Sequence, residues 1–214
     1  MNQQQQNEAP GSTEFLKRIH RCMVKVKGHK TYAVGVVIVS RATFCYVITD
    51  KAIFANPSSK PYTVKFPQGD SQKVQHSDVR FGDELAAFYL KKPNNTTITD
   101  AVVLSDQPVL RKQTYYLFDY TKNSMYSGLC GGNVTSVGVN TFKHDATGLR
   151  LGGPLFTDEC RLIGISTSED SSLAFGANII KSELLGILRQ DDSLVEFTWD
   201  MDDISEHIVN AYVP

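Results

Sequence analysis

The sequence predicts an all-β fold with a short helix near its C-terminal end. Short apolar segments rich in β-branched residues recur along the chain, and several alternate with polar residues at the period of two typical of half-buried strands. Clusters of Pro, Asn, Ser and Gly, as in 56–59 and 67–70, separate these segments at roughly the spacing of an all-β barrel. A helical pattern of apolar residues follows after residue 180.

The first half of the chain is expected to contain a lead-in helix and then strands. Residues 14–20 are predicted to form the helix, and two valines alternate with two lysines over 24–27 in the first strand. The β-branched runs 34–39 and 44–49 are separated by four residues, which predicts a hairpin, and 62–66 alternates again.

The second half continues in the same style. Strand patterns resume from Val109. A short amphipathic helix is predicted over 181–190, with Ser182 as its N-cap. Its apolar face consists of Leu184, Leu185, Ile187 and Leu188.

Length and composition indicate one globular domain. The chain has 214 residues, 41% of them hydrophobic, enough to bury roughly 70% of the unfolded surface. The net charge of −1 provides no global basic field, which argues against nucleic acid as a partner. No apolar run approaches the ~20 residues of a membrane helix, so no membrane partner is expected. Residues 1–13 lack signal-peptide features and are expected to be a disordered lead.

Cysteine usage favours free thiols. An even number of cysteines permits two disulfides: Cys22, Cys45, Cys130 and Cys160. Without a signal peptide, the simpler expectation is reduced thiols and an intracellular protein of the cytoplasm or nucleus. Cys45 lies within an apolar run and is expected to be buried.

The octapeptide at 148–155, Gly-Leu-Arg-Leu-Gly-Gly-Pro-Leu, is the most informative motif. With a serine at position 151 it would match the nucleophile loop Gly-x-Ser-Gly-Gly-Pro-Leu. The leucine side chain has no proton to lose and no lone pair, and nucleophilic catalysis needs an activated oxygen or sulfur beside a base.

Further segments with recognisable motifs accompany this octapeptide along the chain. The hairpin before Thr49 is similar to one that ends in Thr-x-x-His, which places Ala52 at the histidine position. Glu84-Leu85-Ala86 is similar to an Asp-Leu-Ala segment. Additional strand-like segments lie at 132–138, 161–167 and 173–180.

In these motifs the chain resembles the trypsin-like serine proteases, and in its last part their HtrA/Deg branch. The resemblance covers roughly residues 15–190. It implies a trypsin-like double six-stranded β-barrel with a short C-terminal helix. Barrel one is expected over about 14–100 and barrel two over about 101–190 of a domain spanning 14–190, followed by a tail at 191–214.

The resemblance places the catalytic positions on residues that cannot perform the chemistry. Ala52 stands at the base position and cannot accept a proton, and Leu151 stands at the nucleophile position. Glu84 takes the place of the orienting acid, with no imidazole to orient. Leu149 occupies the position of an oxyanion-hole glycine, whose backbone a bulky residue adopts poorly. Because triad members act as a unit, we expect a pseudoenzyme with no catalytic residues.

No motif for a displaced catalytic site is recognisable in the sequence. His144, seven residues before Leu151, is expected to be a loop histidine exposed to water. No metal-binding motif, phosphate loop or dinucleotide motif is present, so neither a metal nor a cofactor is expected.

Two regions are candidates for binding a partner. The resemblance places Ile165, Ser166, Thr167 and Ser168 on the strand that pairs with substrate peptides. The tail mixes acids with apolar side chains, including Phe197, Trp199, Met201 and Ile204. Such a tail either docks onto a partner or another protomer, or packs on its own barrel.

Charge is distributed unevenly. Six basic residues crowd positions 17–30 against only Glu14, and 191–214 contains seven acidic residues with no Lys or Arg. These regions are either solvated faces, a tail folded back onto the basic strand, or a surface for a partner.

The sequence therefore favours an inactive, protease-like module that binds or scaffolds a protein or peptide within a larger complex. One alternative is a hydrolase with a displaced nucleophile. Another is a structural subunit that assembles into a homo-oligomer.

Overall fold

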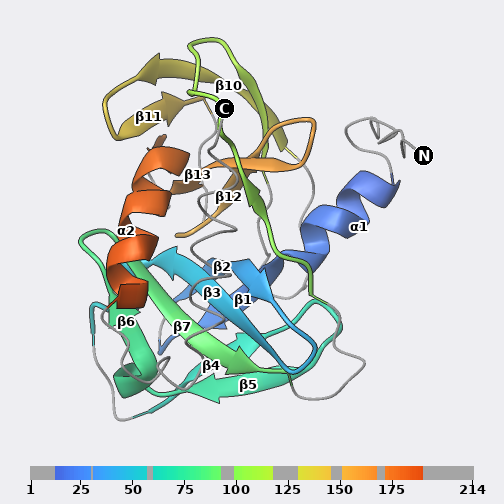
Figure 1. Cartoon of the computed structure of the whole chain (residues 1–214), viewed down its shortest axis with the longest axis vertical. Coiled ribbons are helices and arrows are strands. Elements are labelled where there is room, and N and C mark those ends of the chain that lie inside the picture. The colour runs from blue at the N-terminus through green and yellow to red at the C-terminus, as the bar shows by residue number, and fades with distance from the viewer. Residues whose placement is uncertain are drawn as a thin grey trace.

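Two curled β-sheets, each around its own core, form the body of the molecule, with a helix on either side (Figure 1). The computed structural model describes residues 13–29, 31–56, 60–92, 99–117, 130–145, 151–167 and 172–189. The predicted all-β, two-barrel architecture is confirmed.

Barrel one is built from the first half of the chain. Its sheet has the order β5-β4-β1-β2-β3-β7-β6. The strands are β1 (Met23–Lys27), β2 (Tyr32–Ser40), β3 (Phe44–Asp50), β4 (Tyr62–Lys65), β5 (Ser71–Val74), β6 (Val79–Phe81) and β7 (Leu85–Lys91). Two 3-10 turns, η1 (Lys51–Phe54) and η2 (His76–Asp78), follow β3 and β5. The predicted hairpin is the β2–β3 pair, and Cys45 is fully buried as expected.

Barrel two is built from the second half. Its strands are β8 (Val103–Leu104), β9 (Thr114–Leu117), β10 (Cys130–Val137), β11 (Thr141–His144), β12 (Pro154–Phe156), β13 (Arg161–Ser166) and β14 (Leu173–Gly176). The order is β12-β9-β10-β11-β14-β13-β8, and an additional β12–β13 pairing closes a ring.

Each sheet has one strand in addition to the six expected for its barrel. Both sheets have seven strands among the described residues. In barrel two the closed ring consists of six strands. The seventh, β8, pairs in parallel with Arg161 and Leu162 at the start of β13. In barrel one the additional strand is β6, whose three residues pair with β7. Both additional strands are too short to show a period-two pattern in the sequence.

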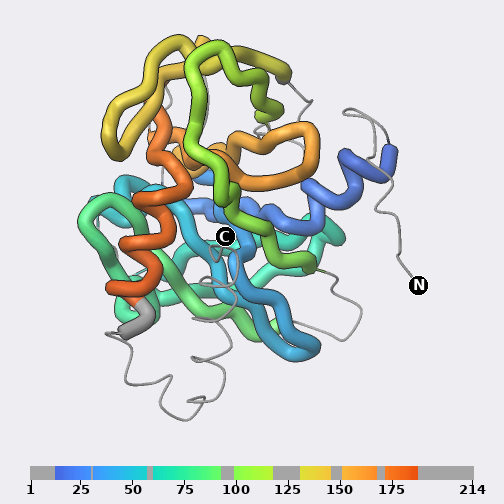
Figure 2. The backbone as a smooth tube through the Cα atoms, turned by 45° about the horizontal axis from the view of Figure 1, so that its top comes forward, coloured from blue at the N-terminus to red at the C-terminus, as the bar shows by residue number. Residues whose placement is uncertain are grey.

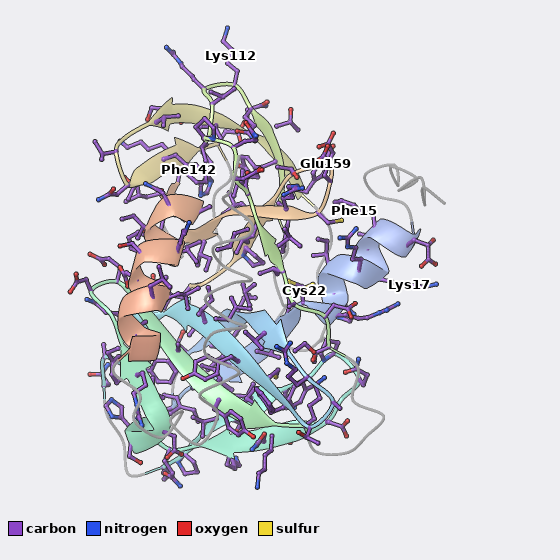
Figure 3. All side chains as sticks on the ribbon, viewed as in Figure 1. Phe15, Lys17, Cys22, Lys112, Phe142 and Glu159 are labelled. Carbon is purple, nitrogen blue, oxygen red and sulfur yellow. The ribbon has the colours of Figure 1, made fainter. Side chains whose placement is uncertain are left out.

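Helix α1 (Thr13–Arg21) confirms the predicted lead-in helix. Its buried side chains are Phe15 and Ile19, four residues apart on one face. Figure 3 shows Phe15 directed toward the barrels and Lys17 directed away from them. The Phe15 ring lies edge-on to Tyr116 of β9, with centroids 5.5 Å apart, so α1 joins barrel two although the strand that follows it belongs to barrel one.

Helix α2 (Ala177–Arg189) begins four residues before the predicted start. Ser182 lies inside the helix and is not its N-cap. The helix starts directly after β14, and Asn178 Nδ2 in its first turn donates a hydrogen bond of 3.1 Å to the carbonyl of Val139. Ile180, Leu184 and Ile187 are buried on one face. In the turned view of Figure 2, α2 crosses from barrel two to barrel one.

A shared core joins the two barrels. Its buried cluster includes Phe15 of α1, Val36 and Ile48 of barrel one, Phe156 of barrel two and Leu184 of α2. Separate clusters fill the interior of each barrel. The junction therefore holds the largest of the three apolar cores, and the candidate site lies at this junction.

Candidate site at the junction of the barrels

The loop at 151–153 connects barrel one to barrel two through backbone hydrogen bonds. The N–H of Val34 donates to the carbonyl of Leu151 at 2.8 Å. On the other side, the N–H of Gly152 donates to Ser166 O at 2.9 Å, and the N–H of Ser166 donates to Gly153 O at 2.8 Å. These bonds fix the position that a nucleophile would occupy relative to both barrels.

Gly152 is required by this arrangement. Its φ of +74° lies in the left-handed region, which favours glycine. A Cβ at this position would overlap the carbonyl oxygen of Val34 and the hydroxyl of Thr49. The Thr49 hydroxyl donates to that same Val34 carbonyl at 2.7 Å, so the loop packs directly against β2 and β3.

Leu151 places its side chain against barrel one. The residue is half-buried and packs against the apolar cluster that fills that barrel. The nucleophile position therefore contributes an isobutyl group to hydrophobic packing.

Ala52 lies in η1, the turn that directly follows β3, and is exposed. Asp50 caps this turn, and its carboxylate accepts a hydrogen bond of 2.7 Å from the Ala52 N–H. Burial raises the pKa of Asp50 to about 6, and the Ala52 N–H opposes that rise.

Asp50 was not identified from the sequence. It is only 4% exposed, so a carboxyl group lies beneath the base position. An acid immediately before a short helical turn is a capping signal, and this signal could have drawn attention to it.

Glu84 lies close to the same turn. The N–H of Lys51 donates to its carbonyl at 3.1 Å, while its side chain is exposed. The carboxylate of Glu183 in α2 accepts hydrogen bonds from the Glu84 N–H at 3.0 Å and the Leu85 N–H at 2.8 Å. Glu183 was also missed, because it is 99 residues from Glu84 in sequence.

The structure thus brings Ala52, Glu84 and Leu151 to one junction. Thr49 touches the loop beside Leu151, and Lys51 connects the Ala52 turn to Glu84. Ala52 and Leu151 contribute a methyl and an isobutyl group to this junction, and neither group can accept or lose a proton.

The predicted peptide-binding strand is only partly described. Ile165 and Ser166 end β13, where Ile165 pairs with Pro154 on one side and Phe175 on the other. Thr167 follows, and its N–H donates to Leu173 O at 3.1 Å. Ser168 and the oxyanion position Leu149 lie outside the described residues, as do the tail candidates Phe197, Trp199, Met201 and Ile204.

The expectation of an exposed His144 is wrong. His144 ends β11 and is 1% exposed, with the ring of Tyr115 5.5 Å away. Phe142 and His144 are two residues apart, so both point into barrel two. This placement removes His144 from the cleft as a base.

A cavity of about 500 Å³ opens beside Ala52. Its wall combines the apolar side chains of Ile53, Pro61 and Tyr62 with three basic side chains, Lys27, His29 and Lys60. The volume lies within the range of ligand-binding pockets.

The described residues were also considered for a metal site, a membrane-spanning helix and disulfide bonds. No group of three or more His, Cys, Asp or Glu side chains among them could hold a metal ion. No helix in this part of the chain is long and apolar enough to cross a membrane. Cys22, Cys45 and Cys160 are buried free thiols, as the sequence predicted for them.

The fold was compared with known proteins. No family model and no curated protein matches the sequence. A serine endoprotease from Yersinia pestis is similar in structure, with a TM-score of 0.66, 17% identity, and coverage of 86% of this chain and 69% of that one. Deg5 has a TM-score of 0.61 and 13% identity, covering 77% of this chain and 88% of its own.

Kallikrein-related peptidase 10, in complex with Zn²⁺, is also similar in structure, with a TM-score of 0.57 and 14% identity. The match covers 80% of this chain and 97% of that one. Together with the two barrels and the junction between them, these likenesses show that the chain has the trypsin-like double-barrel fold of HtrA/Deg-type serine proteases.

Proposed function

We propose that this protein is a catalytically inactive, protease-like module that binds a protein or peptide. One observation supports the proposal: Ala52 in the turn after β3 and Leu151 in the loop between the barrels, which the resemblance assigns to the base and nucleophile, carry only a methyl and an isobutyl group. Proton transfer and nucleophilic attack both need groups that these side chains lack. A fold that retains its cleft without that chemistry is suited to binding.

The resemblance favours binding by strand addition along Ile165 to Ser168. Among the described residues Ile165 is already paired with Pro154 and Phe175. Ser166 is fully buried, with its N–H and carbonyl bonded to Gly153 and Gly152, so a peptide that pairs there would have to displace the loop at 152–153. The three buried thiols fit the intracellular location that the sequence favours.

Active-site labelling tests the inactivity. A fluorophosphonate probe and a thiol-directed probe should leave the native full-length protein unlabelled at its junction. Stoichiometric labelling that one point mutation abolishes would establish instead the alternative of a hydrolase with a displaced nucleophile.

Binding is tested by capture of extended peptides from a library by the full-length protein. Leu151→Arg should abolish capture because it places a cation at the junction. Leu110→Arg, at a leucine that is 63% exposed on barrel two, is the matched control and should retain capture. If both variants capture as the wild type does, the cleft is not the binding surface. Light scattering of the wild type tests the remaining alternative, a homo-oligomeric subunit.

A further inference from the structure

The charged side chains that line the cavity beside Ala52 are all basic. Lys27, His29 and Lys60 line it, and no acidic residue does so among the described residues. The Thr63 hydroxyl in its wall accepts a hydrogen bond of 2.6 Å from the Lys73 ammonium, which places a further cation behind the wall. Cations gathered around a hollow repel one another, and an anion within it relieves this repulsion.

The strands beside the cavity extend the same charge. Lys25 is the register partner of Lys65, and Lys27 is the partner of Thr63, which itself pairs with Lys73. Register partners point to the same side of a sheet, so these four lysines share the face opposite the core of barrel one. Lys25 is buried, with its ammonium 4.3 Å from the centre of the Tyr32 ring, whereas Lys27, Lys65 and Lys73 are exposed. We call the surface of these three exposed lysines the lysine face. Strands β1, β2, β4 and β5 contain no Asp or Glu.

The cavity also has an apolar part. Ile53 and Tyr62 belong to the buried cluster of barrel one, and the Tyr62 ring meets Phe54 edge-on at 4.6 Å. A ligand for this cavity should therefore combine carboxylates with an apolar or aromatic side chain. A free inorganic anion would leave the apolar wall unused.

One segment of the chain has this composition. Residues 191–214, the acidic segment, carry seven acidic side chains and no Lys or Arg. Around Trp199 the sequence is Glu-Phe-Thr-Trp-Asp-Met-Asp-Asp, which alternates acids with apolar residues.

The last described element before the acidic segment contacts the turn beside the cavity. In α2, Glu183 accepts a hydrogen bond from the Glu84 N–H, and the Glu84 carbonyl accepts one from Lys51 in the turn that contains Ala52. The 24 residues of the acidic segment span up to about 80 Å when extended. Attachment to the same chain gives it a high effective concentration at the cavity.

We propose that the cavity beside Ala52 and the adjoining lysine face form a binding site for carboxylate-rich peptide, occupied by the chain's own acidic segment around Trp199. The site does not depend on the proposed function, because it lies on barrel one and does not use the strand at β13. A partner's acidic peptide would have to displace the acidic segment to enter.

Trp199 provides the test, because it is the only tryptophan in the chain. Its fluorescence in the full-length protein, with acrylamide as quencher, measures its shielding. We expect shielding that weakens as salt rises from about 0.02 M to about 0.5 M. In Lys27→Glu/Lys60→Glu the quenching constant at low salt should rise about twofold or more. Lys91→Glu/Lys143→Glu changes the net charge equally at exposed positions away from the cavity, and should behave as the wild type.

A charge swap keeps the test independent of folding. By itself, the triple variant Asp200→Lys/Asp202→Lys/Asp203→Lys should expose Trp199 to the quencher. Combined with Lys27→Glu/Lys60→Glu, it should restore the shielding of Trp199. The proposal is overturned if the two double variants are quenched equally, or if Trp199 of the wild type is fully quenched at low salt. Full quenching would leave the cavity to an external anionic peptide.

Discussion

At position 152 the backbone takes a left-handed conformation in a space too small for a side chain. Gly152→Ala should lower the free energy of unfolding by roughly 2–4 kcal/mol, because backbone strain adds to overlap with Val34 and Thr49. Urea unfolding measures the change. Gly186→Ala in α2, where a Cβ meets nothing within 4 Å, should instead stabilise the protein by roughly 0.5–1 kcal/mol. Equal effects of the two substitutions would contradict this account.

Asp50 predicts a pH dependence of stability. Burial raises its pKa to about 6, so the folded state holds this proton more tightly than the unfolded state, whose pKa is near 3.8. The contribution of Asp50 to the free energy of unfolding is complete below pH 4 and is lost as the pH rises through 6. Between these pH values the free energy of unfolding of the wild type should fall by up to about 3 kcal/mol more than that of Asp50→Asn. Urea unfolding between these pH values measures both proteins; parallel profiles would show that Asp50 has an ordinary pKa.

Among the elements, α2 adds a carboxylate contact with barrel one to the apolar packing of its buried face. Glu183 accepts the N–H groups of Glu84 and Leu85 just before β7. Glu183→Ala should lower the free energy of unfolding by about 1–3 kcal/mol, because two N–H groups lose a charged acceptor. Glu183→Gln keeps one acceptor oxygen and should lower it less. Chemical denaturation monitored by circular dichroism measures the free energy of unfolding of both variants. Equal stability of Glu183→Ala and Glu183→Gln would indicate that the remaining acceptor oxygen contributes nothing.

At the scale of the whole molecule, the shared core predicts that the barrels unfold together. Phe15 is fully buried and links α1 to both barrels through this core. Phe15→Ala should lower the free energy of unfolding by roughly 3–5 kcal/mol while the transition stays single. Circular dichroism and the fluorescence of the tyrosines measure the transition. Leu16→Ala, at a half-buried neighbour, is the milder control. Two resolved transitions would show that the barrels are independent.

The thiols report on the same cooperativity. Burial raises the pKa of both Cys22 and Cys45 to about 12, and Cys160 is also buried. Thiolates are the reactive species, so these three thiols should resist a disulfide reagent at pH 8 until the whole molecule unfolds. Rapid labelling of any of the three in the native protein would reveal local opening.

Sequence patterns predicted the strands because hydrophobic alternation is a local property, whereas the two barrels were predicted from the family resemblance. These patterns failed where contacts between segments distant in sequence determine the structure. The start of α2 depends on the end of β14 and on the bond from Asn178 to Val139, and the role of Glu183 depends on Glu84. His144 was misplaced because its polar side chain outweighed the alternation with Phe142 in β11. The roles assigned to Ala52, Glu84 and Leu151 from motif resemblance stay predictions, and the resemblance did not indicate the buried carboxyl of Asp50.

Leu151 has a consequence for how this position can change in evolution. The residue adds apolar packing to barrel one, and a serine would remove that contribution and leave a hydroxyl against an apolar cluster. Enzymes commonly tolerate an active centre that weakens the fold, because function requires it. Under the function that we propose, folding would therefore oppose a change from Leu151 to a nucleophile.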